Sequence, residues 1–443
     1  MSSFFFDLIA GAFVLGIMVL LHEWGHFVAA KACGVRVDVF SIGFGPRIWG
    51  VKRGDTDYRV SALPLGGYVR MAGDNPAEER TGAPYEFLSR PRWQRFIIAV
   101  AGPAANIVLT FLIFWGIIVF KGAPTAKYVR EPAVVAAVPQ TADPSGVKPG
   151  DQIVEVNGVA TPDWKNVYDQ VEKVKPGGVA SLTVLRNGQS AKLTVPAPNG
   201  PVTAAPDSLV GYPAWPPVTD DVEPGYPAEK AGLKPGDLVV AMNGKPIVTW
   251  PQLPEGIRNS DGHTIHFVVR RDGKEIPIDI TPQKRTVGTD GEMAWVIGAA
   301  GKAETTFERE DFATSVKDAG TQTLFFARAI GEIVASLFRG RLSVRDLAGP
   351  VGIVQLSGQA AKRGPLTLLQ WMAYISLDLG LLNLLPIPIL DGGHVLMLAI
   401  EGILRRDLSV AAKERFVQVG LVFLLCVFAF VMYSDILRLF QSH

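Results

Sequence analysis

The chain is poor in cysteine and nearly free of net charge. Its two cysteines, Cys33 and Cys426, lie beside or within apolar runs that are far apart in the sequence. They provide neither a disulfide framework nor a cysteine-rich zinc site. The net charge is +1, and there is no basic tract and no interleaving of basic with aromatic residues. This balance argues against a nucleic-acid-binding protein.

Apolar residues, by contrast, are abundant. Hydrophobic residues make up 48% of the 443 residues, and the mean hydropathy is +0.23. The chain is too apolar for an ordinary soluble protein, so we expect an integral membrane protein that also carries soluble parts. The apolar runs predict four spans, near residues 8–30, 96–120, 366–385 and 417–432.

The charges around the first run predict its orientation. Asp7 is the only charge before it, so the run lacks the basic start of a signal peptide and is expected to stay as a span. Its far side carries many Lys and Arg residues between Lys31 and Arg95. The positive-inside rule places that side in the cytoplasm and the N-terminus outside.

A His-Glu-x-x-His motif, His22 to His26, lies near the end of the first apolar run. On a helix, His22 and His26 project from one face, a spacing at which two imidazoles bind one zinc ion and Glu23 acts as general base. Metal-binding side chains at membrane depth are costly and therefore indicate function. The alternative is a chance pattern in which the histidines bond to helix neighbours.

The chain offers a third zinc ligand near its third span. Catalytic zinc usually takes three protein ligands, and Asp391 lies in an apolar region between Pro386-Ile-Pro388 and Gly392-Gly393. Broken backbone at membrane depth is tolerated where it lines a cavity. His394 is an alternative ligand, and Asp391 is also a candidate N-cap for the helix that follows, a role compatible with ligation.

The cytoplasmic segment after the first span has β-strand character. Tyr58–Met71 predicts a strand pair with a break at Pro64 and Gly66-Gly67, and Phe40–Pro46 predicts a loop that dips into the membrane interface. This segment is either a small hairpin or an edge strand that captures extended substrate.

The segment between the second and third spans contains an internal repeat. Gly146–Asp151 matches Gly232–Asp237, and Asn157-Gly158 and Trp164 match Asn243-Gly244 and Trp250 at the same offset. The two modules resemble tandem PDZ domains, which bind peptides at a sheet edge; a spacer or sieve that binds no peptide is the alternative. Helical spacing over Phe307–Phe338 then predicts an amphipathic helix.

The expected fold is a polytopic α-helical membrane protein with four transmembrane helices, a membrane-associated β-hairpin and two extracytoplasmic PDZ-like α+β domains. The expected parts are a first transmembrane helix (1–34), a cytoplasmic or re-entrant β segment (35–95), a second transmembrane helix (96–121), PDZ-like domains (122–205 and 206–285), a linker with an amphipathic helix (286–345), a third transmembrane region with a cytoplasmic loop (346–412), and a fourth transmembrane helix with a tail (413–443).

Together, His22–His26 in the first span and Asn383–His394 in the third resemble the site-2 protease family of intramembrane zinc metalloproteases. The two outer modules are similar to those of its regulator-of-sigma-E branch in Gram-negative bacteria. The resemblance implies a zinc ion held by His22, His26 and Asp391, with Glu23 as the catalytic base. It also implies substrate contacts from Asn383 and from the β segment, at Tyr58, Val60, Gly66, Gly67 and Tyr68. One departure is Asp378, where the branch is expected to carry Asn.

The resemblance further implies cleavage of single-span membrane proteins after an earlier cut has removed their outer part. The substrate class is an anti-sigma factor, with leftover signal peptides as an additional candidate. The protein is expected to be a monomer in the bacterial inner membrane, with periplasmic modules and an active site toward the cytoplasm. Two alternatives are a scaffold whose structural zinc is closed by His394, and a metal transporter, which would need ionisable residues through several spans.

Overall fold

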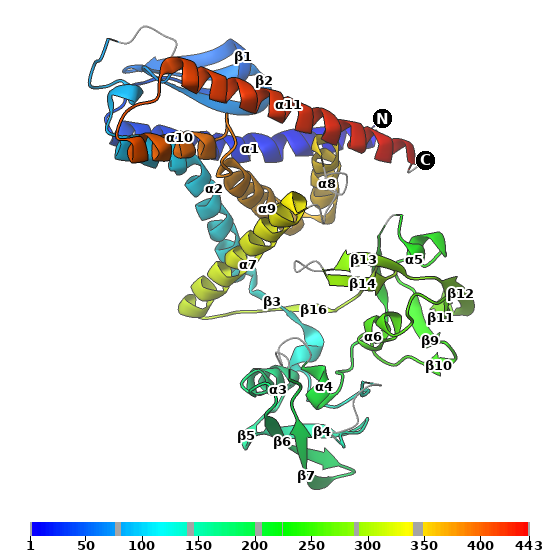
Figure 1. Ribbon diagram of the computed structural model, residues 1–443. Coiled ribbons are helices and arrows are strands. Elements are labelled where there is room, and N and C mark those ends of the chain that lie inside the picture. The colour runs from blue at the N-terminus through cyan, green and yellow to red at the C-terminus, as the bar shows by residue number, and fades with distance from the viewer. Residues whose placement is uncertain are drawn as a thin grey trace. The chain divides into compact units, whose positions relative to one another are not determined.

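The computed structural model describes residues 2–75, 81–139, 146–199, 206–223, 225–287, 292–339 and 349–441 (Figure 1). The chain divides into two compact units. The first, Met1–Gly122 with Arg309–His443, holds the long helices and one sheet; the second, Ala123–Glu308, is rich in short strands.

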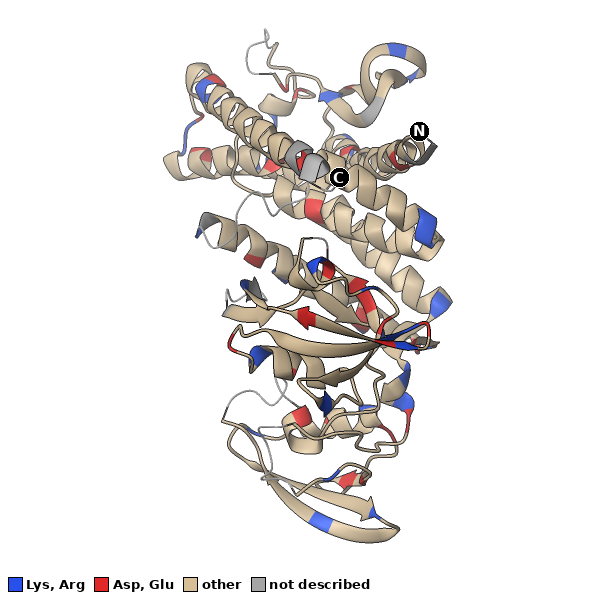
Figure 2. Cartoon of the chain, turned by 90° about the vertical axis from the view of Figure 1, so that its right-hand side faces the viewer, with Lys and Arg blue, Asp and Glu red and all other residues tan. Residues whose placement is uncertain are grey.

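The helices of the first unit are α1 (Ser2–Ala32), α2 (Arg92–Lys121), α7 (Phe312–Phe338), α8 (Pro350–Arg363), α9 (Pro365–Asn383), α10 (Asp391–Leu404) and α11 (Val410–Gln441). Within the described residues, four stretches are long and apolar enough to cross a bilayer: Phe4–Ala32, Arg92–Lys121, Pro365–Asn383 and Val410–Asp435. They correspond to the four expected spans, and Figure 2 shows long uncharged stretches along these helices. Helix α8 is not predicted from the sequence.

Small residues bring α1 and α2 close together. A Cβ on Gly25 would overlap the Ala101 carbonyl oxygen and lie 2.9 Å from Ala105 Cβ. Small residues on both helices therefore permit the close approach of α1 and α2. The contact sets the two histidines of α1 against the face of α2 that also carries Gly102.

The far end of α10 is held by a buried charge. Glu401 is 1% exposed and lies 2.7 Å from Lys413 Nζ at the start of α11 and 3.6 Å from Arg95 Nη1 on α2. A buried carboxylate without such partners would be strongly unfavourable. Since α10 begins with Asp391, these contacts help to fix where that residue lies.

The sheet of the first unit differs from the expected hairpin. Strand β1 (Val37–Arg53) pairs with β2 (Thr56–Met71). The expected loop at Phe40–Pro46 is wrong, because these residues belong to β1. The expected break at Pro64 and Gly66-Gly67 falls where β2 changes sides of β1, since Tyr58 before it and Val69 after it both pair with Phe40. Gly43 and Gly45 both have φ of 88°, which lets β1 bend without ending. Glycine marks a bend here, whereas local sequence alone indicates a loop.

Because both strands bend, the first part of β1 pairs on two sides. Phe40 pairs with Tyr58 and with Val69, and Ser41 pairs with Arg59 and with Tyr68. The end of β2, residues 67–71, pairs only with β1 among the described strands. These residues are therefore an edge of the sheet, and we call them the edge segment.

The second unit contains two sheets with the same strand order, β5-β4-β6-β7 and β10-β9-β11-β12. The first sheet is built from β4 (Gln152–Val156), β5 (Val159–Ala160), β6 (Val179–Arg186) and β7 (Gln189–Pro196), and the second from β9 (Leu238–Met242), β10 (Lys245–Pro246), β11 (Ile265–Arg271) and β12 (Lys274–Ile280). The short helices are α3 (Trp164–Val171), α4 (Asp207–Val210), α5 (Pro227–Lys230) and α6 (Gln252–Arg258).

The repeated Gly-x-Lys-Pro-Gly-Asp sequence builds the same buried ion pair in each module. Asp151 is 1% exposed and pairs with Arg186 at 2.7 Å; Asp237 is 1% exposed and pairs with Arg271 at 2.6 Å. Burial alone would raise the pKa of each carboxyl. Hydrogen bonds from the arginine and from a backbone N–H, that of Lys148 to Asp151 and that of Lys234 to Asp237, lower the pKa below its ordinary value. The sequence repeat is thus a structural repeat as well.

The expected boundaries around residue 285 are not those of the structure. Residue 285 lies inside β13 (Gln283–Val287), and the strands of this unit continue through β14 (Glu292–Val296), β15 (Ala299–Gly301) and β16 (Thr305–Glu308). Strand β15 pairs with β8 (Thr219–Val222), and β16 pairs with β3 (Ala123–Ala126). The amphipathic helix consequently begins at Phe312 rather than near Phe307, because pairing with β3 takes Phe307 into a strand.

Candidate metal centre

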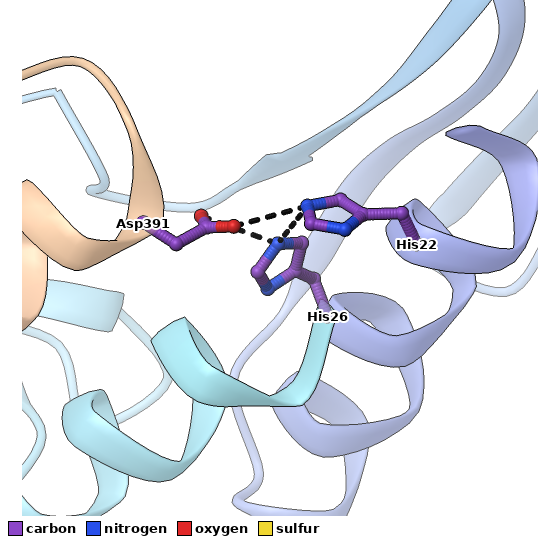
Figure 3. Close-up of side chains that lie close together, drawn as sticks. All are labelled: His22, His26 and Asp391. Carbon is purple, nitrogen blue, oxygen red and sulfur yellow. Dashed lines mark hydrogen bonds and ion pairs between the residues drawn. The ribbon is translucent and has the colours of Figure 1, made fainter. Parts of the chain in front are cut away.

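Three side chains from two distant parts of the chain converge in the first unit (Figure 3). His22 and His26 lie one turn apart on α1, and Asp391 is the first residue of α10. His22 Nε2 lies 3.0 Å from Asp391 Oδ2, His26 Nε2 lies 3.3 Å from Asp391 Oδ1, and the two Nε2 atoms are 3.3 Å apart. This is the geometry of a metal site, with all three donor atoms within 4.8 Å of one another.

The backbone before α10 turns sharply to present Asp391. Ile389 has a φ of 83°, a rare conformation for a β-branched residue and one that costs about 1–3 kcal/mol. A Cβ on Gly392 would overlap carbonyl oxygens of residues 384 and 385, so the chain folds back tightly on itself. The N-cap of α10 is Leu390, so the interpretation of Asp391 as an N-cap is wrong; its carboxylate oxygens face the histidines instead.

A carbonyl on α2 selects the tautomer of His26. His26 Nδ1 lies 2.7 Å from the Ile98 carbonyl oxygen, so Nδ1–H donates to it. The lone pair of Nε2 then points toward Asp391 and His22. This arrangement is the usual one for a histidine that binds a metal.

Gly102 on α2 leaves space beside both donor nitrogens. A Cβ at this position would overlap His26 Nε2, lie 2.7 Å from His26 Cε1 and lie 2.8 Å from His22 Nε2. Only glycine therefore fits at this position while both donor nitrogens stay where they could bind one zinc ion. Two imidazoles, one carboxylate and this space fit a zinc ion.

The site has the open character of a catalytic centre. Among the described residues, the group of candidate ligands consists of His22, His26 and Asp391, and His394 is not part of it. His394 instead lines the adjoining cavity of about 420 Å³, together with Glu23 and Asn383. Three protein ligands beside a cavity are typical of catalytic zinc, whereas a structural site is closed by a fourth.

The edge segment forms one wall of this cavity and contacts Glu23. The cavity is lined by Val69, Met71 and Asp74, and the Val69 N–H donates to Glu23 Oε2 at 3.1 Å. The Met71 N–H donates to Asp74 Oδ2 at 2.9 Å. Asn383 Nδ2 lies 3.4 Å from His22 Nε2, which places this amide at the metal centre.

The other substrate residues predicted in the β segment are divided between the interior of the sheet and its edge. Tyr58 and Val60 are in the middle of the sheet. Tyr58 pairs with Phe40 on one side and Val51 on the other, and Val60 pairs with Ile42 and Trp49. Neither residue can therefore receive an added strand. Gly67 is in the edge segment, where a Cβ would lie 3.7 Å from Glu23 Cγ.

Tyr68 stacks on Phe44 with ring centroids 6.0 Å apart, and the Gly66 backbone has a φ of 107°. Asp378 lies on α9 and is not among the residues that line the cavity, although its neighbour Leu379 is. Gly102, Asn106 and Val69 are not predicted as site residues from the sequence. The signal that could have found Asn106 is a polar side chain inside an apolar span, which suggests function by default.

The chain is similar to known proteases over almost its whole length. The profile of peptidase family M50 matches residues 10–427. The regulator of sigma-E protease RseP of Escherichia coli K12 is 30% identical over 99% of this chain and 100% of the relative. The regulator of sigma E protease of Haemophilus influenzae is 31% identical over 97% and 98%. A Neisseria meningitidis protein whose name describes a zinc metalloprotease is 32% identical over 98% and 99%.

Proposed function

The chain belongs to peptidase family M50 and is a zinc metalloprotease of the site-2 type, and from this premise we propose that it cleaves transmembrane segments of single-span proteins that another protease has already trimmed. The observation that supports the proposal is the group of His22, His26 and Asp391 beside a cavity, with both histidines on an apolar helix long enough to span the bilayer. The protein is an integral protein of the bacterial inner membrane.

The proposed roles of the residues follow from their positions. His22, His26 and Asp391 would hold a zinc ion, which would supply a coordinated water with a pKa of about 7 and polarise the scissile carbonyl. Glu23, adjacent to His22 on the same helix and facing the cavity, removes a proton from the attacking water and delivers it to the leaving amine. Asn383, whose amide lies at His22, donates a hydrogen bond to a substrate carbonyl oxygen.

The edge segment is the proposed site of substrate pairing. The Ala72 N–H donates to the Arg36 carbonyl on the β1 side, so the alternate N–H groups of Val69 and Met71 point away from β1. A transmembrane helix satisfies its own backbone, and pairing with these two N–H groups would compensate for unwinding it. An added strand would have to displace the Glu23 carboxylate from the Val69 N–H and the Asp74 carboxylate from the Met71 N–H.

The two outer modules are proposed to be PDZ-like domains on the periplasmic side that exclude substrates with a large outer part. The second module also has a cavity of about 730 Å³ between α6 and β14–β15, lined by Arg258, Arg285 and Ile297 among others. This cavity supports peptide binding as an additional role for that module. Two of the relatives are named as regulators of sigma E, so an anti-sigma factor is the proposed substrate class. Leftover signal peptides are a second proposed class. The active site is proposed to face the cytoplasm.

The test is cleavage of a labelled single-span substrate, trimmed on its outer side, by detergent-purified wild type and Glu23→Gln. We expect cleavage by wild type alone, loss of cleavage with a zinc chelator, and equal zinc content in both proteins. An untrimmed substrate is the matched control for the proposed filter. Equal cleavage by both proteins would remove Glu23 from the mechanism, and zinc-loaded wild type that cleaves no trimmed substrate would favour a scaffold.

A further inference from the structure

Asn106 is a buried polar residue that the reaction described above does not use. It lies on α2 one turn after Gly102, so both residues face the metal centre. Its side chain is 0% exposed, and its Nδ2 atom lies 3.4 Å from His22 Nδ1. Its Oδ1 atom has no hydrogen-bond partner among the described residues. A buried amide oxygen without a partner is unfavourable, so this position requires an explanation.

The choice of which ring nitrogen of His22 carries the proton provides an explanation for Asn106. A neutral imidazole carries one proton, on Nδ1 or on Nε2. If the Asn106 N–H faces Nδ1, that nitrogen must accept, and the proton sits on Nε2, where it blocks metal binding. If the amide is rotated by half a turn, its oxygen accepts from Nδ1–H, and Nε2 presents a lone pair to the site. The rotation pairs Oδ1 and moves Nδ2 to the place that Oδ1 held, so what favours the rotated amide is the lone pair that His22 Nε2 needs in order to bind a metal.

We propose that Asn106 is a positioning residue that holds His22 in the Nδ1–H form through its amide oxygen and so prepares Nε2 to bind zinc. It does for His22 what the Ile98 carbonyl does for His26. Its own backbone is anchored at this depth, since Ser376 Oγ on α9 donates to the Asn106 carbonyl at 2.9 Å and Thr110 Oγ1 lies 3.0 Å from it. The inference rests on the zinc centre of the proposed function, not on the identity of the substrate.

The experiment compares full-length variants in detergent. Asn106→Leu keeps a similar volume without a hydrogen-bond acceptor, and Asn106→Asp keeps the acceptor. Thr323→Val on α7 is the control because it removes a buried threonine hydroxyl that, among the described residues, bonds only to the Ala319 carbonyl of its own helix and does not touch Asn106 or either histidine. The readouts are zinc per chain, apparent zinc affinity in competition with a chelator, and thermal unfolding of the zinc-free protein.

We expect Asn106→Leu to lower zinc affinity by about 10- to 100-fold, the usual effect of losing such a partner. Asn106→Asp and Thr323→Val are expected to stay near the wild-type affinity. Wild-type affinity in Asn106→Leu would overturn the proposal, as would equal losses in the Leu and Asp variants. If Asn106→Leu does not fold, Asn106→Ala makes the same comparison against Asn106→Asp. Because zinc affinity is measured without substrate, failure of this proposal is distinct from failure of the proposed cleavage.

Discussion

Gly102→Ala is the sharpest test of how the metal centre is built. The substitution adds one methyl group on α2, and in the structure that group would overlap His26 Nε2 and lie 2.7 Å from His26 Cε1 and 2.8 Å from His22 Nε2. Carbon atoms in favourable contact are about 3.5–4.0 Å apart. The methyl group would therefore move one or both donor nitrogens from the positions in which they could hold a zinc ion.

The size of the effect can be worked out from two opposing contributions. Alanine in place of glycine favours the helix by about 1 kcal/mol. Overpacking a tightly packed site costs about 1–3 kcal/mol, and this cost falls on the geometry in which both rings face the ion. At about 1.4 kcal/mol for each factor of ten, zinc affinity should fall roughly 5- to 150-fold while the helix itself is not weakened.

Gly116→Ala is the matched control, since Gly116 lies on the same helix and a Cβ there would meet nothing within 4 Å. The assay measures zinc per chain, zinc affinity against a chelator, and cleavage of the trimmed substrate. We expect Gly102→Ala to lose zinc and cleavage and Gly116→Ala to retain both. If Gly102→Ala binds zinc and cleaves as Gly116→Ala does, the reasoning from the missing Cβ is refuted.

Three further outcomes are expected. Burial raises the pKa of Asp207 to about 6 from 3.8. Because the unfolded chain loses this proton at a lower pH than the folded chain, the second unit should lose up to about 3 kcal/mol of stability as the pH rises from 4 through 6. Thermal unfolding of the full-length protein checks this, and Asp207→Asn should flatten the pH profile. Arg271→Leu leaves the buried Asp237 carboxylate without its arginine and should destabilise the second unit by about 3–5 kcal/mol in denaturant unfolding. Arg270→Leu breaks an exposed ion pair with Glu275 and should cost at most about 1 kcal/mol. Equal losses in the two variants would contradict this account. Asp74→Ala frees an N–H of the edge segment and should lower KM for the trimmed substrate a few-fold with kcat unchanged, while Asp55→Ala in the exposed β1–β2 turn should leave KM as in wild type.

Much of the organisation follows from patterns within short stretches of sequence. The spacing of His22 and His26 places both rings on one helical face because an α-helix has 3.6 residues per turn. Long apolar runs predict spanning helices because a bilayer leaves few other ways to satisfy the backbone. The repeated Gly-x-Lys-Pro-Gly-Asp sequence predicts two equivalent modules, and both sheets have the same strand order. These properties are local, so the sequence by itself determined them.

Other features exist only where distant segments meet. The pairing of β1 with both halves of β2 makes Val69 an edge residue and leaves Tyr58 and Val60 inside the sheet, although all three lie in the same predicted strand pair. Glycines within these strands permit bends, and a local pattern cannot distinguish a bend from a loop.

The surroundings of the metal centre are decided in the same way. Gly102 and Asn106 on α2 are a glycine and an amide in an apolar run, and their sequence gives no sign of what they face. Close contact of α2 with α1 at Gly25 sets one beside both imidazoles and the other beside His22 Nδ1. The sequence alone determined the zinc-binding pattern of α1 and the number of spans, because helix periodicity and apolar length are local. Only the tertiary structure decided which backbone edge, which empty space and which amide surround that pattern, because they depend on how separate helices and strands pack.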